Sequence, residues 1–144
     1  MAFEDFQTLI RLSKWRLDEL RRILQELQDQ EDTLRRLLRE LAEQVIVEMN
    51  ASADQPHEGG LMFAAYYRVA QERAEALENA IVEVQLRIEV ARDNVAEGYK
   101  ELKTYEIAEE NRVEALRQER ARQEQITTDE QAITQFLRAE KSDS

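Results

Sequence analysis

The chain has 144 residues, of which 35% are charged and 6% aromatic, and its formal net charge is −11. Nucleic acids and anionic membrane surfaces repel a protein of this charge, so the composition argues against either as the main partner. One proline and three glycines leave little material for strands and turns, and the lack of cysteine excludes disulfides and thiolate chemistry.

Residues 3–49 carry a hydrophobic seam with heptad spacing. Most a and d positions are apolar, and the intervening positions are mainly Arg, Glu, Gln and Asp. A stripe sustained over several heptads predicts a helix that buries one narrow face against another helix. The a and d positions are Phe3, Phe6, Ile10, Ser13, Leu17, Leu20, Leu24, Leu27, Glu31, Leu34, Leu38, Leu41, Val45 and Glu48.

Residues 50–60, NASADQPHEGG, interrupt this seam with the only proline and two of the three glycines, and therefore predict a turn. A second seam predicts a helix over residues 61–138, followed by a tail at 139–144. We expect an all-α fold: one elongated domain, residues 1–144, forming a two-helix antiparallel coiled-coil hairpin with an overhanging C-terminal helix. The second seam reads Phe63, Tyr67, Ala70, Ala74, Leu77, Ile81, Val84, Ile88, Ala91, Val95, Gly98, Leu102 and Tyr105.

The pairing register follows from large residues facing small ones, which lets two helices approach without voids. A turn centred near residue 54 places Leu17 against Ala91, Leu24 against Val84, and Glu31 opposite Leu77. A slip of one heptad would leave Phe6 facing Glu109, which we consider less favourable.

Residues 106–138 extend past the end of this pairing. The frame of the second seam gives Glu109 and Arg112 where core residues should be, and we expect the later apolar residues to follow a shifted frame. Thr128 with Gln131 is a candidate capping box for a short last helix. Four arginines and a terminal apolar cluster make this segment the candidate contact with a large partner: Arg112, Arg117, Arg120, Arg122, Ile133, Phe136 and Leu137.

Residues suited to catalysis, metal binding or cofactor binding are missing. His57 is the only histidine and lies in the predicted turn, and Gly59-Gly60 lacks the other residues of a phosphate-binding loop. We therefore predict that the protein is not an enzyme and needs no cofactor. No apolar run approaches the ~20 residues of a membrane span, and the N-terminus lacks a signal-peptide layout, so we expect a soluble, unexported protein.

Four segments resemble the FliJ family, the coiled-coil component of the flagellar type III export apparatus. They are FQTLIRLSKWRLDELRRIL and FAAYYRVAQERAEALENAI near the starts of the two helices, then YKELKTYEIAEE and EQITTDEQAITQFLR. The two-helix order and the longer second helix are also similar to that family. Nearly the whole chain is covered by this resemblance.

The resemblance implies a non-enzymatic stalk and adaptor that links and stimulates a hexameric export ATPase and contacts the cytoplasmic region of the membrane export gate. The seven contact candidates within residues 106–138 are then the candidate contacts with the ATPase. It also implies that export chaperones are partners, and that the protein is cytoplasmic, peripheral to the inner membrane at the flagellar base. In the family's gate-binding pattern Leu77 and Ala80 match, whereas Arg73 and Val84 stand where the family has an aromatic residue and a histidine. The alternative function is a structural coiled coil that dimerises through residues 106–138 without a link to secretion.

Overall fold

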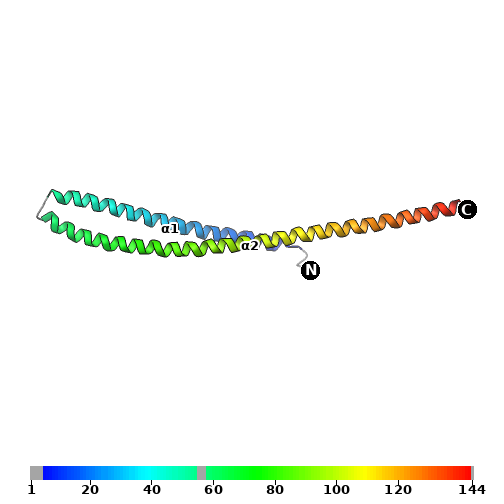
Figure 1. Ribbon diagram of the computed structural model, residues 1–144, viewed down its shortest axis with the longest axis horizontal. Coiled ribbons are helices and arrows are strands. Elements are labelled where there is room, and N and C mark those ends of the chain that lie inside the picture. The colour runs from blue at the N-terminus through cyan, green and yellow to red at the C-terminus, as the bar shows by residue number, and fades with distance from the viewer. Residues whose placement is uncertain (1–4, 55–57, 144) are drawn as a thin grey trace. The chain divides into compact units, whose positions relative to one another are not determined.

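The computed structural model describes residues 5–54 and 58–143 of the chain. Its elements are two helices, α1 (Gln7–Ala53) and α2 (Glu58–Ser142), and no strand occurs in these residues. The prediction of an all-α two-helix hairpin is thereby confirmed (Figure 1).

The helix bounds differ from the predicted 3–49 and 61–138: α1 begins later, at Gln7, and ends later, and α2 is longer at both ends. Residues 50–53 remain helical, and α2 begins at Glu58, so that Gly59 and Gly60 lie in its first turn. Glu58 is an acidic residue in the first turn of α2, and this is favourable because the first turn of a helix carries partial positive charge. The connection is therefore confined to residues 54–57, and His57, like Phe3 of the first seam, lies outside the described residues.

The C-terminal part of α2 is one uninterrupted helix. Thr128 is not a cap, because its hydroxyl donates a 2.9 Å hydrogen bond to the carbonyl of Glu124 one turn earlier. The helix also continues beyond residue 138 to Ser142. The expectation of a break at Thr128 was therefore wrong.

Contacts divide the chain into two compact units, which we describe separately. The first is Trp15–Tyr99 and contains the connection between the helices. The second combines Met1–Lys14 with Lys100–Ser144, the start of α1 and the end of α2.

Within Trp15–Tyr99, α1 and α2 run side by side in opposite directions (Figure 1). The predicted a and d positions form the covered face, with the remaining core positions half-buried. Tyr67 is an exception, since its side chain is exposed and the preceding Tyr66 is half-buried instead. The buried apolar residues of this unit are Leu17, Ala70, Ile81, Val84, Ile88 and Ala91.

The register of this pairing differs from the expected one by one heptad. A Cβ atom placed on Gly98 would lie 3.5 Å from Cδ1 of Leu17 and 3.0 Å from Cδ1 of Leu20. Gly98, one heptad beyond Ala91, is therefore the residue that faces Leu17, and its missing side chain makes room for the two leucines. Because residues 50–53 are helical, the midpoint between the two helices lies later than residue 54. In a heptad repeat, the next register in which apolar layers meet is a full heptad away.

In the second unit, the start of α1 packs against residues 102–112 of α2. Ile10 and Leu102 are buried, and the rings of Phe6 and Tyr105 stack with their centroids 6.4 Å apart. The covered face continues through Glu109 to the half-buried Arg112, beyond the expected end near Tyr105. Every residue from 113 to 143 is exposed.

Candidate protein-interaction surfaces

Glu109 of α2 caps the N-terminus of α1. The carbonyl of Phe6 accepts the first helical hydrogen bond from Ile10 N–H at 2.8 Å, which makes Phe6 the capping position. The N–H of Phe6 donates to Oε2 of Glu109 at 2.9 Å. A carboxylate at this point satisfies a backbone donor that the helix leaves unpaired and interacts favourably with the helix dipole.

Arg112 completes this contact. Its Nη2 and Nε donate to the two carboxylate oxygens of Glu109 at 2.7 and 3.1 Å. These bonds from Arg112, followed by the bond from Phe6, lower the pKa of Glu109 from 4.5 to about 2. The pairing of Phe6 with Glu109, which the sequence disfavoured as a misfit, is thus a satisfied contact. Arg112 therefore belongs to the paired end of the molecule and differs in this from the other three candidate arginines.

The exposed segment Val113–Asp143 balances much of its charge along its own helix. Arg117 lies 3.4 Å from Glu114, and Arg122 lies 2.8 Å from Glu119. Hydrogen bonds from Arg122 and then Gln123 lower the pKa of Glu119 to about 2. Such exposed i, i+3 pairs favour the helix only weakly, because water screens the charges. They leave the apolar side chains of the segment without a covering partner.

Four of these apolar residues, Leu116 among them, occupy the heptad frame of the buried seam. Ile126 and Ile133 fall on the same d positions as Tyr105 and Arg112, and Leu137 falls on the a position. The expected shift of frame was therefore wrong. We call this set, with Phe136, the C-terminal apolar face; the exposed fractions are Leu116 52%, Ile126 39%, Ile133 60%, Phe136 69% and Leu137 52%.

The candidate gate-contact residues lie on α2 within Trp15–Tyr99. Arg73 is exposed, Leu77 and Ala80 are half-buried, and Val84 is buried with an exposed fraction of 7%. Val84 is part of the covered seam, so a partner can reach the other three candidates but not this side chain while the hairpin is closed.

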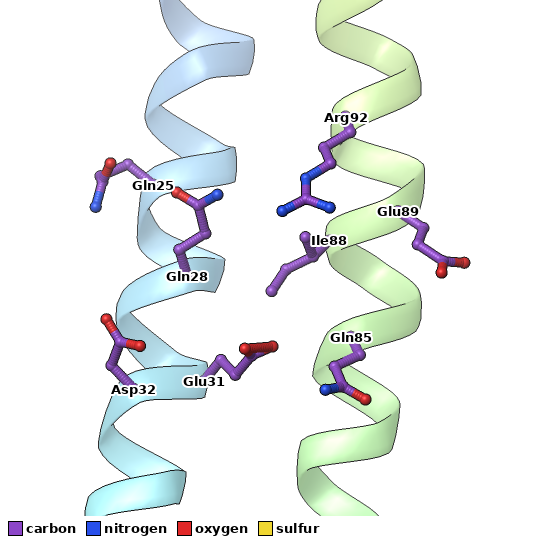
Figure 2. A pocket seen from close by; sticks show the side chains of 8 residues that line it. All are labelled: Gln25, Gln28, Glu31, Asp32, Gln85, Ile88, Glu89 and Arg92. Carbon is purple, nitrogen blue, oxygen red and sulfur yellow. The ribbon is translucent and has the colours of Figure 1, made fainter.

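A polar groove crosses the hairpin near its middle (Figure 2). Glu31 points toward α2 at the level of Gln85 and Ile88, and not at Leu77 as the sequence suggested. Its Oε1 lies 3.4 Å from Nε of Arg35, one turn later on the same helix. The groove is lined by Gln25, Gln28, Glu31, Asp32, Gln85, Ile88, Glu89 and Arg92.

This groove does not amount to a metal site. In residues 5–54 and 58–143, no group of three or more His, Cys, Asp or Glu side chains is placed to hold a metal ion. Nor is any described helix apolar enough over a sufficient length to span a membrane.

The chain matches no protein-family model, no curated protein and no solved structure.

Proposed function

We propose that this protein is a non-enzymatic stalk and adaptor of flagellar type III protein export, which links and stimulates a hexameric export ATPase. The observation that carries the proposal is that α2 continues as a helix beyond its pairing with α1 and exposes an apolar face there. The resemblance of four sequence segments to the FliJ family supplies the identity of the partner.

A helix with this much exposed apolar surface needs a partner. Isolated helices are marginal in water, and most helical stability in proteins comes from packing of an apolar face. Ion pairs such as Arg122–Glu119 support the helix, but they do not cover Ile133 or Phe136. The segment therefore suits the end of a rod that is inserted into a larger assembly.

The composition of this end also fits a ring of subunits. Arg117, Arg120 and Arg122 are exposed and would make polar contacts that can be exchanged between successive subunits. Large apolar interfaces, by contrast, are typical of permanent complexes. Ile133, Phe136 and Leu137 would add a small apolar anchor near the tip, since a few buried apolar residues carry most of the energy of an interface.

The remaining contacts follow from the same proposal. The membrane export gate would meet the side of α2 that carries Arg73, Leu77 and Ala80, and export chaperones would be further partners. The protein would then act in the cytoplasm, peripheral to the inner membrane at the flagellar base.

Truncation after Arg112 tests the proposal. This variant keeps Glu109, and with it the cap on α1, so the hairpin should stay folded with a melting temperature close to that of the full chain. It should fail to stimulate ATP hydrolysis by the purified hexameric export ATPase. Normal stimulation by the truncated hairpin would contradict the proposal.

A point variant separates the apolar anchor from the length of the helix. Leu137→Ser should reduce stimulation of the ATPase, because Leu137 belongs to the proposed anchor. Leu86→Ser is the matched control, since Leu86 is a similarly exposed leucine (59%) of the same helix outside the extension. Equal loss of stimulation in both variants would show that the C-terminal apolar face is not the contact.

A further inference from the structure

We infer that the C-terminal apolar face binds the same face of a second copy of this chain, with the two helices antiparallel. This inference does not depend on the proposed function, since it rests on the heptad frame, the burial and the charges of the segment. It names an occupant for the face when no other partner is bound.

Continuity with the hairpin seam is the first argument. The a and d positions of α2 that are covered by the start of α1, such as Leu102 and Tyr105, belong to the same frame as Leu116, Ile126 and Ile133. One side of α2 therefore carries the heptad pattern that packs against an antiparallel helix. This pattern continues in the part of α2 that α1 does not reach. A second copy of the segment provides an antiparallel helix with the same repeat.

The layers select one register for such a dimer. In an antiparallel coiled coil, a positions of one helix face d positions of the other. With the two-fold axis between residues 124 and 125, Leu116 faces Ile133 of the second copy, and Gln123 faces Ile126. Each pairing occurs twice by symmetry, so that Leu116, Ile126 and Ile133 of both copies are all covered. A shift of one heptad that moves the two-fold axis toward the C-terminus would place Leu116 opposite Glu140 instead.

Charge favours the same register. Arg122 and Asp129 both occupy g positions, which flank the seam, and this alignment brings Arg122 of each copy beside Asp129 of the other. Flanking charges of this kind set partner choice and orientation in coiled coils. Two kinds of layer are unfavourable in this register: Glu119 faces Glu130, and Leu137 faces Arg112 of the other copy. Arg122, which already bonds Glu119 at 2.8 Å, lies next to the first of these layers and offsets part of its repulsion.

Disulfide crosslinking tests the orientation, and the chain has no cysteine of its own to interfere. A chain with Leu116→Cys mixed with a chain with Ile133→Cys should form a crosslinked dimer under mild oxidation. Either variant alone should form little, because in the antiparallel dimer the two copies of residue 116 are separated by about 25 Å along the axis at a rise of 1.5 Å per residue. Efficient crosslinking of Leu116→Cys alone would mean a parallel dimer and would overturn the inference.

A charge exchange tests the register. Arg122→Asp should weaken the dimer at least several-fold in analytical ultracentrifugation, and adding Asp129→Arg should restore it. A full-length chain that remains monomeric at high concentration, with no mixed crosslink, would overturn the inference. Such a result would leave the stalk proposal standing if the same protein still stimulated the ATPase, so the two failures are distinguishable.

Discussion

The paired and unpaired stretches of α2 share a heptad frame but differ in what fills it. Up to Leu102 the a and d positions are almost all apolar, and α1 covers all of them except Tyr67. Beyond Arg112, polar residues alternate with Ile and Leu at these positions, and every residue is exposed. A continuous heptad repeat therefore does not imply uniform stability along a helix. The composition of the layers and the length of the partner helix decide which part is stable on its own.

The register of the paired stretch gives an all-or-none test. Leu17→Cys combined with Gly98→Cys should crosslink within one chain, because a Cβ atom on Gly98 lies 4.0 Å from Cα of Leu17. Leu24→Cys with Val84→Cys, the pair that the sequence favours, should not crosslink within the chain. Gel mobility with and without reductant distinguishes the two, and the reverse pattern would restore the register expected from the sequence.

Identical substitutions in the two stretches should have very different effects on stability. Leu17→Ala removes a side chain with an exposed fraction of 3% and should lower the free energy of unfolding by about 2–4 kcal/mol. Leu116→Ala, where the leucine is 52% exposed, should change it by no more than about 0.5 kcal/mol in dilute protein. Urea titrations followed by circular dichroism measure both, and equal losses would mean that the extension is packed in the monomer.

Glu31 is the acidic residue of the paired stretch whose replacement should stabilise the molecule. Glu31→Leu would turn a half-buried carboxylate, whose side chain is 23% exposed, into an apolar layer and should raise the free energy of unfolding by about 1 kcal/mol. Glu40→Leu is the control, because Glu40 is an exposed acid of the same helix in a similar ion pair, with Arg36 at 3.0 Å. A lower melting temperature for Glu31→Leu would show that the polar groove is a stabilising contact.

Glu109 should be needed at neutral pH and dispensable in acid. Its pKa is lowered from 4.5 to about 2, so its contribution is present above about pH 4.5 and is lost as the pH falls toward about 2. Glu109→Gln should thus lower the melting temperature modestly at pH 7, and the gap to the unaltered protein should close over that range. Glu119→Gln is the matched control: the pKa of Glu119 is similarly low, but Glu119 lies in the exposed segment and should leave hairpin melting unchanged.

The sequence was sufficient to predict the helices, their covered faces and the unpaired extension. It was not sufficient for the register, because a heptad pattern repeats and a one-heptad slip again places apolar residues opposite one another. The facing of Leu17 with Gly98 depends on where the connection lies, and residues 50–53 contain no strong signal that they stay helical. The sequence also led to the wrong expectation for Glu109. An acidic residue at a seam position is expected to be unfavourable unless it is known that the N-terminus of the facing helix supplies a hydrogen-bond donor.

The candidate contact residues were less predictable than the fold. Leu77 and Val84 fit a seam and a binding surface equally well from sequence, and Val84 proves to be buried. Arg112 looked like one more charge of the extension, whereas its partner Glu109 was interpretable only once Phe6 was placed beside it.

The cap on α1 also determines the order in which the molecule opens. The contact between Phe6 and Glu109 joins residues 103 positions apart. It closes a longer loop than any layer nearer the connection, so its formation costs more chain entropy than theirs. We therefore expect amide hydrogen exchange to be fastest, among the paired residues, over the first turns of α1. Each such opening would uncover Leu102 and Tyr105 as well, and would lengthen the stretch of α2 available to a partner without unfolding the rest of the hairpin.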